Sequence, residues 1–291
     1  MQDDSVITAA GARERSMETA AGAAPRARTM DVAAATVVFR LVREELCVGL
    51  PVAAGRRVVP ACTPDASGGD AALHAAAQAS AARAVAAREI VRIAHAGVRA
   101  CAAQPGTGSE SSLIVVSWAT ARPVVAGGSS SDGIVADEVF IPLSALPELD
   151  ADTRSVLSCA FEAFLDATLA DAVTRRLLPR HVLFRKTDGF DARSPFEQAL
   201  GRDAATTAPQ DIEPPIFVGL LPDPFPLSAL RELYERLLGA PLDRGNFRRQ
   251  FHEIISLGPV KALPIFERGV PHRAGQLFTF DRLAWTRFAT K

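Results

Sequence analysis

Basic and amide side chains gather in one short stretch near the C-terminus, directly after Asp243. Arginine binds guanine edges and phosphates, and asparagine pairs with adenine through two hydrogen bonds. A helix that reads duplex DNA carries such side chains on its first turns, where they enter the major groove. The stretch predicts this chemistry through Arg244, Gly245, Asn246, Arg248, Arg249 and His252.

Apolar residues recur through the same stretch with the spacing of an amphipathic helix. At about 100° per residue, they fall on the side opposite the basic residues. Asp243 is a good N-cap, so we expect the helix over residues 244–255. Gly245 costs about 1 kcal/mol of helix propensity relative to alanine, but it lets a phosphate approach the helix N-terminus, which favours anions. The apolar side consists of Phe247, Phe251 and Ile254.

The elements that must position this helix follow from leucine spacing and proline placement. A preceding helix ends at Gly239, and residues 240–242 form a short turn before Asp243. Beyond the second helix, prolines bracket extended runs at 260–262 and 276–280. The apolar face of the first helix comprises Leu227, Leu230, Leu233, Tyr234, Leu237 and Leu238. Helix, tight turn, helix and β-hairpin make a winged helix-turn-helix.

Charge is distributed unevenly between this C-terminal region and the rest of the chain. Residues 213–291 hold eleven Lys and Arg against eight Asp and Glu, a net charge of +3. The whole chain carries −1, so the remainder carries −4. This asymmetry favours a nucleic-acid partner for the C-terminal region. A winged helix can instead bind proteins, and in that case Arg248→Ala with Arg249→Ala leaves DNA affinity unchanged because there is none.

Composition bounds the class of protein. Hydrophobic residues make up 48% and charged residues 22% of the chain, which excludes wholesale disorder. No apolar run approaches the length of about 18 residues that a membrane span needs. The four cysteines lack CxxC spacing, so we expect reduced thiols in a cytoplasmic protein without a zinc knuckle. Residues 1–30 lack the apolar segment of a secretory signal, so we expect a disordered leader or a start at Met30.

The N-terminal half has the pattern of strands around one helix. Residues 31–50 predict a strand, a turn and a second strand, and residues 112–119 and 135–143 predict further strands. An alanine-rich run predicts a helix over residues 71–95 with Asp70 as its cap. This combination is an α+β arrangement.

The pattern changes again from Asp152. Apolar residues from Val156 to Val173 recur at three- and four-residue spacing, which predicts an amphipathic helix capped by Asp152. The polar stretch that follows is punctuated by proline and glycine and predicts a linker. We therefore expect a leader at 1–30, one domain at 31–150, a linker helix at 151–180, a loop at 181–215 and a winged helix domain at 216–291.

Three motifs of the C-terminal region resemble the winged-helix end of the Nudix-related transcriptional regulators. They are FPLSALRELYERLLG at 225–239, PLDRGNFRR at 241–249 and HRAGQLFTFD at 272–281, the last of which is similar to the family's wing. The resemblance implies a double-stranded DNA partner and adds His272 and Arg273, on the wing, to the DNA-binding residues. Pro226 stands where the family usually has a capping threonine, and Gly245 where a basic residue is common.

The same family joins its winged helix to an effector-binding Nudix-like domain and represses NAD metabolism. Residues 31–150 resemble that domain in outline, with strands near Val37 and Val115 and a helix near Arg88. The resemblance implies a Nudix-like α/β/α sandwich followed by a winged helix, and a nucleotide effector: ADP-ribose, NAD or ATP. Candidate effector-binding residues are Arg56, Arg57 and Arg88, and the alternative for the loop arginines Arg56 and Arg57 is that they are merely solvated.

Hydrolysis by a Nudix enzyme needs several carboxylates on one helix face, because Mg²⁺ takes oxygen ligands and activates the attacking water. The run 71–95 offers one acid, Glu89, followed by apolar and basic residues. We therefore expect no catalytic residue, no metal site and no cofactor. The enzyme alternative is a nucleotide pyrophosphatase whose activity would be lost on Glu89→Gln. It would use displaced acids such as Asp65, Asp70 and Glu110.

These patterns together predict a cytoplasmic, homodimeric transcription regulator. We expect it to repress genes of NAD or cofactor metabolism and to sense a nucleotide. The homodimer follows from the two-fold half-sites that helix-turn-helix proteins bind. The helix from Asp152 is the expected link between the effector state and the DNA-binding helices.

Overall fold

The computed structural model describes residues 31–65, 67–102, 111–123, 139–178, 213–267 and 275–289. The expected leader, Glu110, most of the expected loop at 181–215, and the wing residues His272 and Arg273 lie outside the described residues. No helix within the described ranges is long and apolar enough to cross a bilayer.

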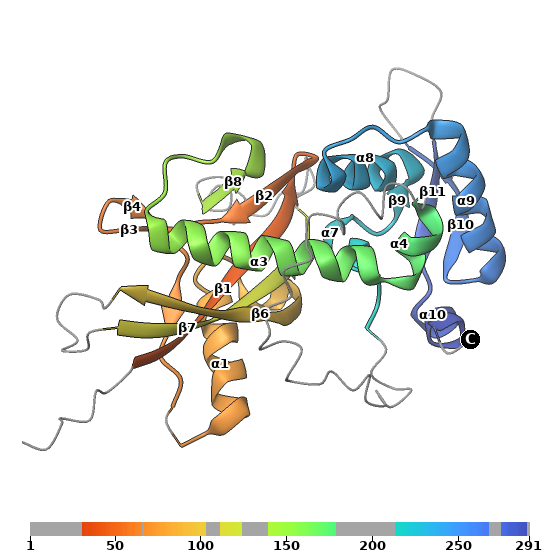
Figure 1. Cartoon of the computed structure of the whole chain (residues 1–291). Helices are drawn as coiled ribbons and strands as arrows, with labels where there is room; N and C mark the ends of the chain where they lie inside the picture. The colour runs from red at the N-terminus through yellow and green to blue at the C-terminus, as the bar shows by residue number, and fades with distance from the viewer. Residues whose placement is uncertain are drawn as a thin grey trace, which may run out of the picture.

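A six-stranded sheet organises the N-terminal part of the molecule (Figure 1). Its strands are β1 (Asp31–Val42), β2 (Glu45–Gly49), β5 (Ala61–Cys62), β6 (Ile90–Ala102), β7 (Ser111–Ala121) and β8 (Phe140–Pro142). The strand order is β6-β7-β1-β2-β8, with β5 also paired to β1. β1 and β7 run parallel, and the other pairs run antiparallel. The strands expected over 31–50 and 112–119 are confirmed. Of the strand expected over 135–143, residues 140–142 form β8, residues 139 and 143 lie outside the strand, and residues 135–138 lie outside the described residues.

Helices cover both faces of this sheet (Figure 1). Helix α1 (Gly69–Ala81) lies against β1, where the hydroxyl of Thr36 donates to the carbonyl of Ala77 at 2.8 Å. Helix α3 (Ala151–Ala170) lies on the opposite face. There the fully buried Phe164 stacks on Phe39 with ring centroids 4.5 Å apart. The expected α/β/α sandwich is therefore confirmed.

The alanine-rich helix is shorter than the sequence pattern predicts. α1 ends at Ala81, and residues 87–89 form a 3-10 turn before β6 begins at Ile90. The prediction of a helix over 71–95 is thus wrong beyond Ala81. Residues 90–93 are rich in β-branched side chains, which favour strand pairing over helix, and they pair with β7.

Two of the expected helix caps are displaced along the chain. Gly68 rather than Asp70 is the N-cap of α1, and it forms no side-chain hydrogen bond. Asp150 rather than Asp152 caps α3, because its carboxylate accepts the N–H of Thr153 at 2.9 Å. That hydrogen bond holds the pKa of Asp150 below its ordinary value. Both predicted caps lie inside the first turn of their helices.

The amphipathic helix expected to run on to Val173 is broken at Asp171. The carboxylate of Asp171 caps a new helix, α4 (Ala172–Leu177), by accepting the N–H groups of Val173 and Thr174. Burial raises the pKa of Asp171, against the lowering effect of its hydrogen bonds with Thr174. The hydroxyl of Thr174 also lies 2.7 Å from the hydroxyl of Tyr234, a buried residue of the C-terminal part.

The C-terminal part has the helix–turn–helix–hairpin order expected from the sequence (Figure 1). Its elements are α7 (Phe217–Leu220), β9 (Phe225–Pro226), α8 (Leu227–Leu238), α9 (Arg244–Leu257), β10 (Val260–Phe266), β11 (Gln276–Phe280) and α10 (Arg282–Ala289). The strands form a sheet in the order β10-β11-β9. The sequence patterns predict neither α7 nor α10.

One hydrophobic core continues from the N-terminal sheet into the C-terminal part. Phe39, Phe164, Tyr234 and Phe251 belong to the same cluster of buried side chains. Helix α4 packs against α9. The cysteines Cys47, Cys101 and Cys159 are buried, Cys62 is half-buried, and all four are free thiols, as the sequence predicts.

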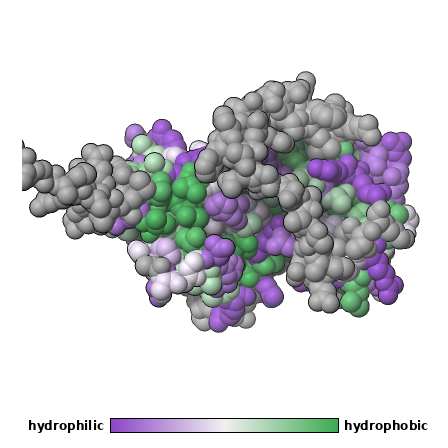
Figure 2. All heavy atoms as spheres, turned by 60° about the horizontal axis from the view of Figure 1, so that its bottom comes forward, coloured by the Kyte–Doolittle hydropathy of each residue, from purple (hydrophilic) through white to green (hydrophobic). Residues whose placement is uncertain are grey.

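Apolar surface remains on the α1 side of the sheet. Val32 and Thr36 lie four residues apart on β1, so both side chains point to the same face of the sheet, which is the face that α1 covers. Val98 of β6 lies opposite Val115, which pairs with β1 on the same face. Val32 and Val98 are 38% and 48% exposed. Figure 2 shows apolar side chains gathered on the N-terminal part of the molecule, so α1 leaves some of this face uncovered.

Candidate nucleic-acid interface

Helix α9 begins at the residue that its sequence pattern predicts. Asp243 is the N-cap, and its Oδ1 accepts the N–H of Asn246 at 2.7 Å. The helix ends at Leu257, and Gly258 follows in the left-handed conformation with a φ of 102°. The first turn is therefore capped. Its N-terminus favours an anion, because a helix N-terminus carries partial positive charge.

The two sides of α9 differ as its periodicity predicts. Phe247, Phe251 and Ile254 are buried, and Phe251 packs edge-on against Phe278 of β11 with ring centroids 4.9 Å apart. The predicted orientation of the helix is confirmed, whereas its contact with DNA stays a prediction. The other side exposes Arg244, Gly245, Arg248, Arg249 and His252, with Asn246 half-buried among them.

The guanidinium groups on this side are in two different states. Arg249 Nη2 donates to Asn246 Oδ1 at 2.7 Å, which holds both side chains on the same turn. Arg244 and Arg248 form no ion pair with any residue that the structure describes. Their positive charges are therefore available to phosphates, which supply most of the electrostatic affinity for DNA.

A cavity of about 650 Å³ lies between α9 and the preceding helix α8. Arg231 in its wall is engaged by carboxylates, whereas Arg244 and Arg248 stand at its α9 side without such partners. In helix-turn-helix proteins the first helix crosses the DNA backbone beside the recognition helix. The lining residues are Leu227, Ser228, Arg231, Glu232, Arg244, Phe247 and Arg248.

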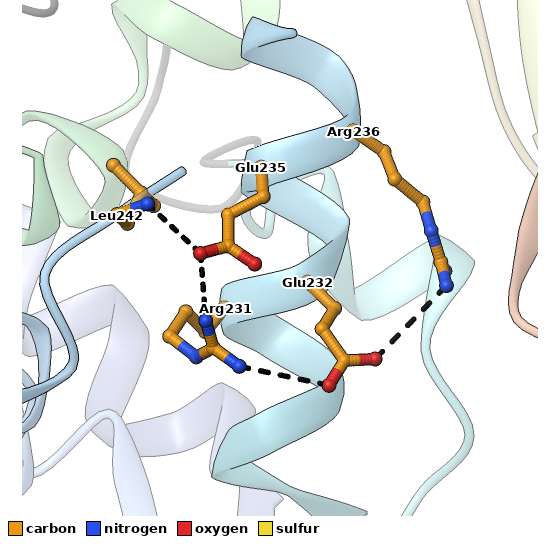
Figure 3. Close-up of polar contacts among 5 residues, drawn as sticks. All are labelled: Arg231, Glu232, Glu235, Arg236 and Leu242. Carbon is orange, nitrogen blue, oxygen red and sulfur yellow. Dashed lines mark hydrogen bonds and ion pairs between the residues drawn. The ribbon is translucent and has the colours of Figure 1, made fainter. Parts of the chain in front are cut away.

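The turn between α8 and α9 is fixed by Glu235 (Figure 3). Its Oε1 accepts the backbone N–H of Leu242 at 2.8 Å and the Arg231 guanidinium at 2.6 Å. Gly239, with a φ of 63°, lets the chain leave α8 in the left-handed conformation. Sequence reasoning misses the role of Glu235, although its four-residue spacing from Arg231 is the signal of a helical ion pair.

Replacing Glu235 with alanine is expected to destabilise the protein by about 1–3 kcal/mol, because the N–H of Leu242 loses its acceptor. It should also weaken DNA binding, since the turn sets the angle between α8 and α9. Urea denaturation and DNA titration measure the two effects. Glu232→Ala is the matched control, because its ion pairs at 3.7 and 4.0 Å predict a loss of less than about 1 kcal/mol. Equal losses in the two variants would contradict the role of Glu235.

The two departures from the regulator pattern have different structural consequences. Pro226 is the N-cap of α8 and forms no side-chain hydrogen bond, so the contact of a capping threonine is missing. At Gly245, an added Cβ would lie 3.5 Å from Asp243 Oδ1, which is an ordinary contact. Neither crowding nor a left-handed backbone therefore requires glycine at 245.

The arginines proposed for effector binding lie away from α9. Arg56 and Arg57 form β4 (Arg56–Arg57), which pairs with β3 (Val52–Ala53) in a small hairpin. Arg57 Nη1 donates to the carbonyl of Leu50 at 2.9 Å. Arg88 is exposed in the 3-10 turn before β6. These arginines do not line the cavity beside α9, and their effector role stays a prediction.

Acidic residues of the N-terminal part are dispersed. α1 carries one carboxylate, Asp70, and Glu89 lies outside this helix, paired with Arg40 at 2.9 Å. Asp65 accepts hydrogen bonds from Ser67, which lower the pKa of that carboxyl. In the part of the chain that the structure describes, no three His, Cys, Asp or Glu side chains gather to hold a metal ion.

Comparison with known proteins identifies a matching domain family and solved structures with a similar fold. Residues 217–280 match the family model of the NrtR DNA-binding winged helix domain. The structure of Shewanella oneidensis NrtR complexed with a 27mer DNA aligns over 89% of this chain and 95% of its own, with 17% identity and a TM-score of 0.53. The structure of S. oneidensis NrtR aligns over 87% of this chain and 94% of its own, with 16% identity and a TM-score of 0.52. No curated protein matches the chain by sequence.

The structure of a MutT/nudix family protein from Enterococcus faecalis aligns over 87% of this chain and 88% of its own, with 11% identity and a TM-score of 0.42. The family match begins with α7 and ends with β11, so it includes the turn, α9 and both described wing strands. The chain as a whole shares the fold of NrtR, and its C-terminal part matches the model of the NrtR DNA-binding winged helix domain.

Proposed function

We propose that this protein is a transcription regulator that binds duplex DNA through α9. The observation that carries the proposal is the exposed side of α9, where Arg244, Arg248 and Arg249 follow a capped helix N-terminus. Membership of residues 217–280 in the NrtR DNA-binding winged helix family supports it. His272 and Arg273 are proposed as wing contacts on the basis of their motif.

We further propose that the protein acts as a homodimer on a two-fold operator and represses genes of NAD or cofactor metabolism. ADP-ribose, NAD and ATP are the proposed effectors. The resemblance of the C-terminal motifs to the Nudix-related regulators supports these assignments. The N-terminal part then serves as a sensor and not as an enzyme, and the low carboxylate content of α1 supports this role.

Fluorescence anisotropy of a labelled duplex from the gene's own upstream region, with excess competitor DNA, tests the proposal. We expect Arg248→Ala and Arg249→Ala each to weaken binding by about 1–3 kcal/mol where the side chain reads a base. Loss of a phosphate contact instead lowers the salt slope by about one. Repeating the titration with NAD, ADP-ribose and ATP identifies the effector.

Arg122→Ala is the matched control, because Arg122 is an exposed arginine that follows β7, outside the winged helix. It removes the same charge and is expected to leave DNA affinity unchanged. If the double variant Arg248→Ala, Arg249→Ala binds DNA as tightly as Arg122→Ala, α9 does not read DNA. The winged helix is then better explained as a protein-interaction module.

A further inference from the structure

A second cavity lies where β2, the segment after β8, α3 and α8 meet, and we call it the α3–α8 cleft. Its volume is about 760 Å³, within the range of about 300–1,000 Å³ that small-molecule sites occupy. Leucines form most of its apolar wall, which Pro147 and Phe161 of α3 complete. The leucines are Leu46, Leu143, Leu146, Leu149 and Leu157.

Two guanidinium groups reach this apolar cleft from different parts of the chain. Arg154 of α3 donates from Nη2 to the carbonyl of Leu149 at 3.0 Å, which fixes its position in the wall. Arg236 comes from α8, on the side of that helix away from Glu235 (Figure 3). Its ion pair with Glu232 is long, at 4.0 Å, so its charge is weakly neutralised by the described residues.

The remaining polar groups of the lining leave an excess of positive charge. The lining contains one acidic residue, Glu45, and two arginines. Ser144 and Ser158 are exposed there and add hydroxyl groups that can donate to an anion. A ligand with one negative group would balance this charge.

The side chain of Phe161 indicates which apolar group the ligand carries besides its acid. Phe161 is half-buried, and its ring centroid lies 6.0 Å from that of Phe39 in the core, which supports it from behind. A supported ring of this kind offers a flat apolar face on which a planar group stacks. The cleft therefore combines a surface for a ring with two cations for an acid.

We propose that the α3–α8 cleft binds an organic anion that carries a flat apolar ring. Arg154 and Arg236 would hold its carboxylate or phosphate, and Phe161 would contact its ring. As a regulatory site the cleft rests on the proposed function, because Arg236 belongs to the DNA-binding unit while Arg154 belongs to α3. A bound anion ties these two elements together and so links ligand occupancy to the position of α8.

Isothermal titration calorimetry of the full chain tests the site with 2-naphthyl phosphate and 2-naphthoate. We expect both to bind at one site per chain, and the tighter of the two identifies the acid group that the cleft prefers. Inorganic phosphate and the neutral 2-naphthylmethanol should bind at least about tenfold more weakly, because each lacks one of the two groups. Arg154→Gln and Arg236→Gln should each weaken the preferred anion by about tenfold or more. Arg122→Gln should leave it unchanged.

The site is overturned if neither aromatic anion binds, if the neutral alcohol binds equally well, or if Arg236→Gln keeps full affinity. Arg236 is exposed, so Arg236→Gln is expected to fold. This variant therefore tests the site even if Arg154→Gln fails to fold. DNA titration of the same protein is read separately. If the protein binds the anion but not DNA, the proposed regulator is contradicted and the anion site is supported. If it binds DNA but not the anion, the anion site is contradicted and the proposed regulator is supported.

Discussion

Replacing Glu89 with alanine is expected to lower the free energy of unfolding by about 3–5 kcal/mol. Glu89 pairs with Arg40 at 2.9 Å, and the side chain of Arg40 is only 7% exposed. The Arg40 guanidinium lies over the ring of Phe140, 5.4 Å from its centroid, and its Nε has no hydrogen-bond partner among the described residues. Removing Glu89 therefore leaves a buried positive charge without its counterion, which is costly in an apolar environment.

Urea denaturation of the full chain, followed by circular dichroism, measures this loss. Glu162→Ala is the matched control, because Glu162 is an exposed acid on α3, and surface changes usually stay within about 0.5 kcal/mol. Adding Arg40→Met to Glu89→Ala should restore most of the stability, since it removes the uncompensated charge. A Glu89→Ala variant as stable as Glu162→Ala would contradict the pairing.

The pairing also changes how the enzyme alternative must be tested. A pyrophosphatase would lose ADP-ribose hydrolysis on Glu89→Gln, but the same substitution disturbs the Arg40 pair. Loss of hydrolysis therefore counts as evidence for catalysis only if the variant keeps its circular dichroism spectrum and its urea midpoint.

Replacing Phe164 with alanine is expected to cost about 3–5 kcal/mol, as large-to-small changes of buried aromatic residues do. Phe164 is fully buried, its ring lies at 22° to that of Phe39, and it meets the ring of Trp118 edge-on with centroids 5.4 Å apart. The three rings hold α3 against the sheet. The cavity left by alanine would remove contacts on both sides of that junction.

Urea denaturation with tryptophan fluorescence suits this variant, since Trp118 is one of two tryptophans in the chain. Phe164→Leu is the matched control: it keeps most of the volume and should cost less than about 1.5 kcal/mol. If alanine and leucine destabilise equally, the aromatic contacts do not hold α3 in place. If neither destabilises, Phe164 does not lie in the core.

Helix α9 could be predicted from sequence because its determinants are local. The spacing of Phe247, Phe251 and Ile254 fixes which side is buried, and Asp243 fixes where the helix begins. Both depend on residues within one or two turns, so no tertiary information is needed. Its end at Leu257 rather than 255 shows that the final turn is set by Gly258.

The helix predicted over 71–95 fails for the opposite reason. Alanine favours helix strongly enough to extend the pattern, but residues 90–93 pair with β7, which is distant in sequence. Pairing of this kind overrides local propensity. The Arg40–Glu89 pair and the α3–α8 cleft are equally invisible in sequence, because each brings together segments that only the tertiary fold places side by side.

The hydrogen bond between Thr174 and Tyr234 bears on the half-site spacing of the proposed regulator. With α4 packed on α9 and one core running through both parts, α9 is joined to the N-terminal sheet by continuous packing. If the proposed homodimer forms through its N-terminal sheets, this packing would set the separation of the two α9 helices. For the proposed regulator, operator spacing would then depend on the N-terminal part, and a mutation that shifts how the two sheets meet would change which operators fit.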